Sequence, residues 1–419
     1  MTVTRLSVLF LQFIFNILCP DHNADAFKIP AKDVDNYSIF DTIITYLLSG
    51  LTRWDGEYFM HIAKYGYTYE NTLAFYPLYP IIVRITAAVI RRVLFVLSIH
   101  SSIMLAAVLI NLICFVKSAI VFYDLSKAVL KKTNVAYKAA ILYCINPATI
   151  FFSAAYSESL FAYLTFYSMF RSTKLDPYVS FPLGLAILVR SNGMVTVGFP
   201  IYYGCCFLLN IIIVSLAPFL LLQIYNYILF CIPDSNQLHV PSHVKNYGLE
   251  NNLVLAGNGS AEWCQAKIPI SYSYIQNKYW NVGFLKYYEF KQIPNFILAF
   301  PVLFIMALCI KGYYIQHKRY FYTLGLFDDI ENEKYAKQNE YPAEMLVFIV
   351  HGLFLIIFCT LLVHIQVSTR LICSASPLIY WYCALTMSYY TAADILILSY
   401  FLGYAFIGCF MFSNFLPWT

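Results

Sequence analysis

Residues 102–123 read SIMLAAVLINLICFVKSAIVFY, an apolar run that contains a single charged side chain, Lys117. About 20 such residues suffice for a helix to cross the hydrocarbon core of a bilayer. Lysines follow the run at positions 127, 131, 132 and 138, and basic residues beside a span favour the cytosolic side. The stretch therefore predicts a membrane-spanning helix whose carboxyl end faces the cytosol.

The composition of the whole chain agrees with this prediction. Of its 419 residues, 60% are hydrophobic and only 12% are charged, whereas soluble domains carry about 25% charged residues. The net charge of +5 is modest, and no basic run is interleaved with aromatics, which excludes a nucleic-acid-binding protein. We predict an all-α polytopic membrane protein with about 8–10 membrane segments.

Apolar runs recur along the chain. The segment 81–97 carries three arginines and is predicted to lie in the interface, and one or two spans are expected after Leu371. The other runs are 139–152, which Asn146-Pro147 should break, 161–170, 181–203, 205–231, 295–310 and 346–363. Arg190-Ser191-Asn192-Gly193 interrupts 181–203 and is interpreted as the tip of a hairpin entering from the cytosol.

We predict a single membrane domain, residues 1–419. The order of the apolar runs predicts which side of the membrane each polar segment faces. Residues 20–80 and 232–294 are expected in the lumen, and residues 311–344 in the cytosol. The N-terminal run from Leu6 to Cys19 is short for a span, and Ala24-Asp25-Ala26 resembles a signal-peptidase site. A retained helix and a removed signal peptide both stay open, and both place residues after Pro20 on the lumenal side.

Most of the 12 cysteines lie in apolar runs, where they are expected to behave as small buried hydrophobes. Their spacing does not predict a zinc site. Cys231 and Cys264 flank a polar loop and are candidates for a disulfide in an oxidising lumen. The glycosylation sequons at Asn36 and Asn258 also fit a lumenal location.

The segment Arg53-Trp54-Asp55-Gly56-Glu57 contains the main candidate for a catalytic residue. A general base must be ionised and able to reach the attacking hydroxyl, and we assign this role to Asp55. The alternative is that Asp55 caps the helix predicted by the apolar spacing from Tyr58 to Tyr65. Glu57 is predicted to be a supporting or solvated acid.

Glu158 stands at the head of a predicted span, where the helix dipole would stabilise its charge. An acid beside the bilayer is also costly unless it is used, so a supporting role in the site and a structural role both stay open. Arg190 and Arg370 lie in or beside apolar runs and are candidates to bind a phosphate, because the guanidinium fork matches phosphate oxygens. His364 is a third candidate for this role, and structural ion pairing is the alternative for all three.

The polar loop before residue 294 combines rings and amides, which suits a sugar site because rings stack on sugars and amides bond their hydroxyls. The candidate acceptor-binding residues are Trp54, Gln276, Tyr279, Trp280 and Asn281, although anchoring in the interface explains such aromatics equally well. Asp328-Asp329 is interpreted as a solvated turn in the cytosolic loop. We therefore predict no metal site and no cofactor.

Several motifs resemble the PIG-V family, the GPI mannosyltransferases 2, over nearly the whole chain. They are Arg53-Trp54-Asp55 with Phe59, Ile62-Ala63 and Gly66-Tyr67; Ala74-Phe75-Tyr76-Pro77 with Pro80; Asn146-Pro147-Ala148 with Tyr156-Ser157-Glu158; Arg190-Ser191-Asn192-Gly193; Tyr279–Tyr288; Lys291–Phe296; Gln366–Arg370; and Asn414–Thr419.

The resemblance implies a GT-C glycosyltransferase fold with its active site on lumenal loops of the endoplasmic reticulum membrane. It implies dolichyl-phosphate mannose as donor and a mannosyl-GlcN-phosphatidylinositol GPI precursor as acceptor, which receives its second mannose in α1,6 linkage. The acid that the family carries in its first lumenal loop corresponds to Asp55.

Two other classes of protein are considered. A lipid transporter or scramblase would use intramembrane charges such as Arg190 along a pathway, although no inverted repeat is visible in the sequence. A non-catalytic subunit of a membrane transferase complex would use Asp55 only as a helix cap. The need for an accessory subunit is left open.

Overall fold

The computed structural model describes residues 1–30, 38–204, 208–233, 240–325, 340–388 and 391–418. Its α-helices are α1 Thr2–Leu18, α2 Ile39–Leu48, α3 Asp55–Tyr65, α4 Leu78–Val93, α5 Ile99–Leu130, α6 Thr133–Cys144, α7 Glu158–Thr173, α8 Ser180–Val189, α9 Gly198–Tyr202, α10 Leu208–Cys231, α11 Ser242–Glu250, α12 Ser271–Trp280, α13 Ile293–Gln316, α14 Lys318–Tyr322, α16 Leu346–Leu361, α17 Ser368–Ala375, α18 Leu378–Thr386 and α19 Ala392–Ser413. Short 3₁₀ helices are η1 Ser49–Leu51, η2 Glu70–Ala74, η3 Pro177–Val179, η4 Ser191–Val197, η5 Glu262–Gln265, η6 Phe290–Gln292, η8 Ala343–Met345 and η9 Ile365–Val367.

Within the described ranges, five helical stretches are long and apolar enough to cross a membrane. They are α5, α10, α13 together with η6, α16 together with η8, and α19. Three shorter apolar helical stretches, at residues 2–18, 39–51 and 177–189, add to these. The predicted all-α polytopic fold is confirmed, and the side of the membrane that each loop faces stays a prediction.

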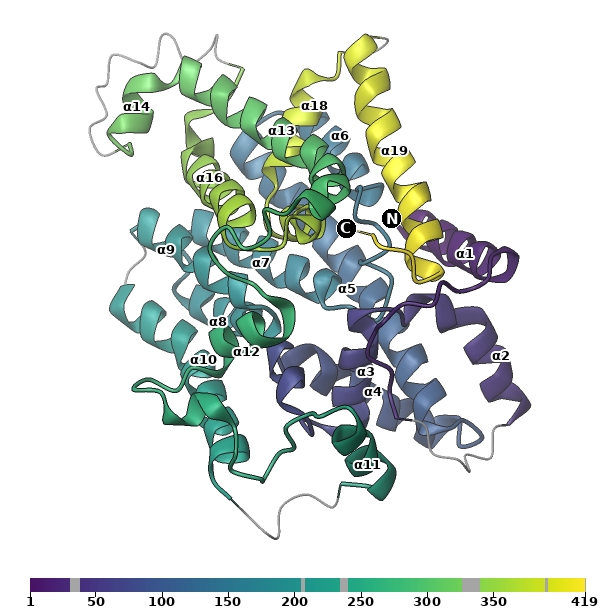
Figure 1. Ribbon diagram of the computed structural model, residues 1–419. Helices are drawn as coiled ribbons and strands as arrows, with labels where there is room; N and C mark the ends of the chain where they lie inside the picture. Colours follow the sequence, from purple (N-terminus) through teal and green to yellow (C-terminus); the bar gives the residue numbers. More distant parts are fainter. Residues whose placement is uncertain (31–37, 205–207, 234–239, 326–339, 389–390, 419) are drawn as a thin grey trace.

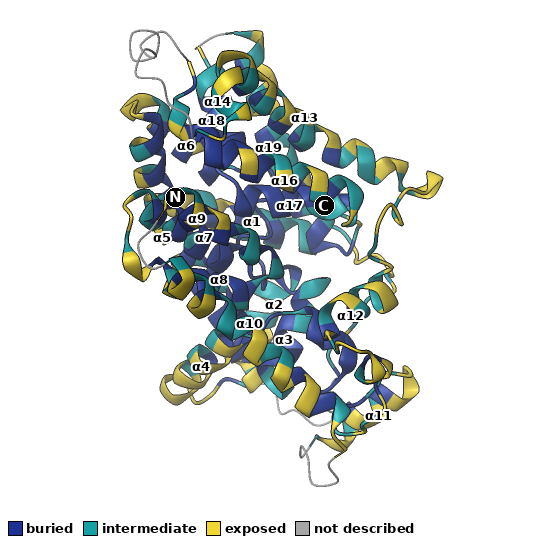
Figure 2. Ribbon diagram, turned by 90° about the vertical axis from the view of Figure 1, so that its left-hand side faces the viewer, coloured by how far each residue is buried: buried dark blue, intermediate teal, exposed yellow. Residues whose placement is uncertain are grey.

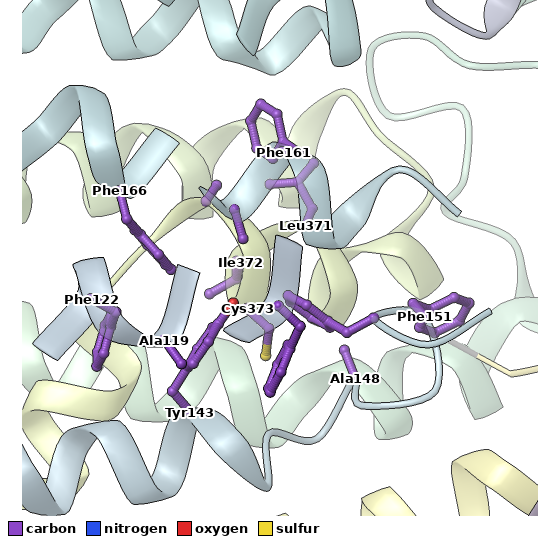
Figure 3. Packing of buried hydrophobic residues seen from close by; sticks show 14 of the residues in the cluster. Ala119, Phe122, Tyr143, Ala148, Phe151, Phe161, Phe166, Leu371, Ile372 and Cys373 are labelled. Atoms are coloured by element: carbon purple, nitrogen blue, oxygen red, sulfur yellow. The ribbon is translucent and has the colours of Figure 1, made fainter. Parts of the chain in front are cut away.

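The core lies around the long helix α5, which packs against α4, α6 and α7 (Figure 1). Buried residues fill the middle of the molecule around α1, α7 and α17, whereas the outer faces of α4 and α11 carry many exposed residues (Figure 2). Aromatic side chains from α5, α6 and α7, such as Phe122, Tyr143 and Phe166, pack beside Leu371 and Ile372 of α17 (Figure 3). This packing fixes α17, which carries Arg370.

Two predicted interruptions are confirmed. Helix α6 ends at Cys144, just before Asn146-Pro147, because proline cannot continue a helix. Helix α8 ends at Val189, and η4 folds back on it after Arg190. A Cβ atom at Gly193 would lie 2.9 Å from the backbone of Ala186, so this close approach requires glycine.

The connection between α6 and α7 crosses the interior and is held by two buried polar side chains. The Arg5 guanidinium donates to the carbonyl oxygens of Thr149 at 2.9 Å and Cys144 at 3.0 Å. The Asn111 amide donates to the carbonyl oxygen of Tyr156 at 3.0 Å. The N-terminal run is thus a helix packed into the fold, and it fixes the segment that leads to Glu158.

Helices α11 and α12 belong to the polar region 232–294, which packs against α3 and η2; α11 lies below α3 in Figure 1. Cys231 and Cys264, the candidate pair of the sequence analysis, form a disulfide, with their Cα atoms 5.5 Å apart. The sequon residue Asn258 is exposed. Asn36, Cys205 and Asp328-Asp329, which the sequence analysis singled out, lie outside the described residues.

Candidate active site

Asp55 is the first residue of α3, and the N-cap position belongs to Trp54, which makes no side-chain capping bond. The interpretation of Asp55 as a helix cap is therefore wrong by one residue. The backbone of Trp54 has φ 57° and ψ −123°, a conformation that a bulky L-residue rarely adopts and that costs about 1–3 kcal/mol. The hydroxyl of Tyr156 accepts a hydrogen bond from the Asp55 amide at 3.0 Å and helps to hold this turn.

The carboxylate of Asp55 meets Arg370, which lies far away in the sequence. The Oδ2 atom of Asp55 is 2.8 Å from Nη2 of Arg370. The other guanidinium nitrogen of Arg370 is 3.8 Å from Oε1 of Glu158, and this same oxygen is paired with Arg190. The structure therefore joins four predicted site residues into one chain of alternating charge: Asp55, Arg370, Glu158 and Arg190.

The two carboxylates of this network differ in exposure. The side chain of Glu158 is fully buried, whereas 26% of the Asp55 side chain is exposed. Both residues start a helix, α3 and α7 respectively, where the helix dipole favours negative charge. Burial alone would lower the pKa of the Arg370 guanidinium, but Asp55 and then Glu158 raise it above its ordinary value. Arg370 therefore stays charged, and Asp55 is the acid that a substrate can reach.

A pocket of about 220 Å³ opens beside this ion pair. Asp55, Arg370 and Gln366 supply its polar groups, and the remaining lining residues are Trp54, Phe151, Tyr156, Val367, Phe412, Pro417 and Trp418. The Arg370 guanidinium also lies 5.2 Å from the centre of the Phe151 ring and 5.4 Å from that of Tyr156. The pocket thus combines a carboxylate and a cation with aromatic faces, the groups that a charged sugar derivative needs.

Glu57 does not line this pocket. It lies on α3 two residues after Asp55, and its carboxylate accepts a hydrogen bond from the amide of Ile29 at 3.1 Å. Burial raises its pKa from 4.5 to about 7. The structure therefore places Glu57 against the segment before residue 30, and its supporting role in the reaction stays a prediction.

His364 and the predicted acceptor-binding residues Trp280 and Asn281 meet one another at the edge of the site. The His364 imidazole lies beside the backbone of Trp280 and Asn281, and its ring lies 4.5 Å from that of Tyr287. The Tyr287 hydroxyl donates to Oε1 of Gln366 at 2.9 Å. The polar loop is therefore tied to the pocket through Gln366, while Trp280 and Asn281 stand outside its lining.

Tyr279 and Gln276 also lie outside the pocket lining. The hydroxyl of Tyr279 donates to the buried carboxylate of Glu70 at 2.7 Å, and Lys278 pairs with the same oxygen at 3.0 Å. The backbone carbonyl of Gln276 accepts from Val282 at 3.0 Å. The two contacts with Glu70 dock α12 on η2, whereas the bond to Gln276 closes the end of α12 itself.

The aromatic wall was not predicted from residue chemistry. Phe151 belongs to the α6–α7 connection, Phe412 to α19, and Pro417 and Trp418 to the segment that follows α19. None of them is polar, so only the sequence motifs that contain Tyr156 and residues 414–419 pointed to these regions.

Fold and site together define a class: a polytopic membrane protein with a carboxylate–guanidinium pair in an aromatic-walled pocket. A family model described as "Mannosyltransferase (PIG-V)" matches residues 1–209 and 201–419. The chain belongs to the PIG-V mannosyltransferase family, and it is therefore a glycosyltransferase.

Individual relatives agree with this assignment. GPI mannosyltransferase 2 of Drosophila melanogaster is 38% identical over 448 residues, which cover 99% of this chain and 98% of the relative. GPI alpha-1,6-mannosyltransferase 2 of Homo sapiens is 33% identical over 479 residues, with 99% and 96% covered. Among solved structures, an archaeal oligosaccharyltransferase from Archaeoglobus fulgidus matches with a TM-score of 0.43 at 10% identity, covering 98% of this chain and 55% of its own.

Proposed function

We propose that this protein transfers mannose from dolichyl-phosphate mannose to a mannosyl-GlcN-phosphatidylinositol precursor, adding the second mannose of the GPI anchor in α1,6 linkage. Family membership and the name of the human relative, GPI alpha-1,6-mannosyltransferase 2, support this proposal. We place the reaction on the lumenal side of the endoplasmic reticulum membrane, with the GT-C arrangement of membrane helices that the family resemblance implies.

The observation that carries the proposal is the Asp55–Arg370 pair in the aromatic-walled pocket. The mannose is β-linked in the donor and α-linked in the product, so one in-line displacement inverts its anomeric carbon. Asp55 takes the proton of the acceptor 6-hydroxyl while that oxygen bonds to the anomeric carbon. The bond from that carbon to the phosphate oxygen breaks, and dolichyl phosphate leaves with the electron pair.

The departing phosphate already carries negative charge, so it needs a neighbouring cation rather than an acid. Arg370 is the cation that lines the pocket, and its fork can contact a phosphate oxygen and Asp55 together. Glu158 and Arg190 lie behind Arg370 and hold it in place through the buried ion pairs. In this proposal the reaction uses no metal and no cofactor.

The acceptor is proposed to enter past the polar loop. Trp54 lines the pocket itself, while Trp280, Asn281 and His364 lie at the edge that Tyr287 connects to Gln366. Gln276 and Tyr279 are proposed as more distant acceptor contacts on α12. Because both substrates are lipids, the bilayer restricts their orientation and raises their effective concentration at this edge.

Complementation of cells that lack the second GPI mannosyltransferase tests the proposal. The wild-type chain should restore GPI-anchored proteins at the cell surface, whereas Asp55→Asn, made at the same level, should leave a precursor with a single mannose. Full rescue by Asp55→Asn would remove the base assignment. Purified wild-type chain in liposomes should transfer mannose by itself, which neither a lipid transporter nor a non-catalytic subunit would do.

A further inference from the structure

The C-terminal segment folds back over the pocket instead of leaving the membrane domain. Helix α19 ends at Ser413, and Phe415 adopts φ 57°. The amide of Leu416 donates to the carbonyl of Met411 at 2.9 Å, and that of Phe415 donates to the carbonyl of Phe412 at 3.4 Å. This pair of bonds is the Schellman motif that reverses the chain at a helix end, so the residues that follow return towards Asp55.

Arg53 ties this returning segment to the catalytic turn. Its guanidinium donates to the carbonyl of Ser413 at 3.2 Å and lies 4.5 Å from the centre of the Phe415 ring. The Phe415 ring also makes an edge contact with Trp54 at 5.9 Å. Residues 53 and 54 directly precede Asp55, so the position of the tail and that of the catalytic carboxylate are mechanically linked.

The ring of Trp418 packs against Gly408 of helix α19. A Cβ atom at Gly408 of α19 would lie 2.6 Å from Nε1 of Trp418 and 2.8 Å from Cε2. The ring therefore occupies space that a side chain at position 408 would fill, and Tyr404 contacts it with the ring centres 5.5 Å apart. With one edge fixed on α19, Trp418 joins Pro417 in the wall of the pocket that contains Asp55 and Arg370.

We propose that Trp418 is a specificity-determining residue that packs against the apolar face of a hexose ring in the pocket. Asp55, Arg370 and Gln366 bring charged and amide groups to the pocket, whereas the tail brings Pro417 and the ring of Trp418, whose indole nitrogen lies on Gly408. A pyranose has hydroxyls at its edge and C–H groups on its face, and an aromatic ring is the partner for that face. The inference rests on the proposed function, and the measurement below decides whether this hexose is the mannose of the donor or that of the acceptor.

Two glycines of α19 give a matched test. Gly408→Ala forces Trp418 to move, whereas Gly403→Ala places its methyl group in open space, with no atom within 4 Å. Both changes add the same methyl group inside one helix and alter helix propensity equally. In liposomes, Gly408→Ala should raise the KM of one substrate about two- to tenfold, the range of one aromatic contact, and Gly403→Ala should leave both KM values unchanged.

The substrate whose KM rises carries the mannose against which Trp418 packs. This substrate is either dolichyl-phosphate mannose or the mannosylated acceptor. Trp418→Ala should produce the same rise in KM, and Trp418→Phe should restore most of it. In the Trp418→Ala background, Gly408→Ala should cost nothing more, because the displaced ring is already gone. Equal thermal midpoints of the two glycine variants would show that the fold is intact.

The inference is overturned if Gly408→Ala and Gly403→Ala behave alike, or if Gly408→Ala retains its full effect without Trp418. Its failure is distinguishable from failure of the proposed function. If Asp55→Asn is inactive while both glycine variants have normal KM values, only the role of Trp418 is lost. If Asp55→Asn transfers mannose normally, the mechanism on which the inference rests is lost as well.

Discussion

Removal of the Arg370 guanidinium should affect stability and activity in different ways. Arg370 lies 2.8 Å from Asp55 and 3.8 Å from Glu158. With an effective dielectric constant of about 20, the gross attractions are about 6 and about 4 kcal/mol, before the cost of desolvation. Truncating one partner of a buried ion pair typically costs about 3–5 kcal/mol. We expect the lower end, because Arg190 still pairs with Glu158 and water can reach Asp55.

The assay compares Arg370→Met, Arg370→Lys and the double variant Glu158→Gln/Arg370→Met. Thermal unfolding in detergent should show a loss of about 3 kcal/mol for Arg370→Met. The double variant should lose more, because Glu158→Gln also removes the carboxylate that pairs with Arg190. Mannose transfer should fall about 10²–10³-fold in both variants that lack the cation, and less in Arg370→Lys.

The result that refutes this reasoning is specific. If Arg370→Met unfolds at the wild-type temperature and transfers mannose normally at limiting donor, Arg370 neither compensates the two carboxylates nor meets the phosphate. If the double variant recovers both stability and activity, the role of Arg370 is structural only.

Three further predictions concern the surroundings of the site. The folded-state pKa of Glu57 is raised to about 7 from 4.5, so the folded protein binds the proton more tightly and Glu57 costs stability as pH rises through this interval. Glu57→Gln should therefore unfold at a higher temperature than wild type above pH 7 and at the same temperature below pH 4.5. A difference in unfolding temperature that does not change with pH would contradict the burial of this carboxyl. Cys264→Ser removes the disulfide between two residues that are 33 positions apart, and it should lower the free energy of unfolding by about 3–4 kcal/mol. We expect faster proteolysis within residues 232–264. Unchanged cleavage would show that the disulfide does not stabilise this region. Asn258 is exposed, and a lumenal location would allow its glycosylation. Asn258→Gln should then abolish one mobility shift that endoglycosidase removes from the wild-type chain. A wild-type chain without a glycan at Asn258 would contradict the lumenal location of this region.

Local chemistry was sufficient to predict much of the fold. The apolar runs identify the long helices, and Asn146-Pro147 marks the end of α6 because proline removes a backbone donor. The positions of Cys231 and Cys264 on either side of a polar loop made them candidates for a disulfide, and the structure contains that bond. Helix boundaries were less accurate: α3 starts at Asp55 because Trp54 adopts a backbone conformation that no sequence pattern indicates for tryptophan.

For the candidate site, the sequence indicated individual residues but not the contacts between them. Glu158, Arg190 and Arg370 are conspicuous as charges in or beside apolar runs, and Asp55 stands out in the polar segment 53–57, but the pairing of these four residues joins segments that no periodicity relates. The tail that brings Trp418 to the pocket depends on a chain reversal and on the absence of a side chain at Gly408, which only the packed structure reveals.

The central claim is that one carboxylate in this pocket accepts the proton of the acceptor hydroxyl. Its most direct test is the turnover of purified Asp55→Asn in liposomes at saturating donor and acceptor. The control is Asp176→Asn, which neutralises an acid paired with Arg171 past the far end of α7. We predict that turnover falls about 10²–10⁴-fold for Asp55→Asn and stays unchanged for Asp176→Asn. Turnover of Asp55→Asn within a few fold of wild type would contradict the account.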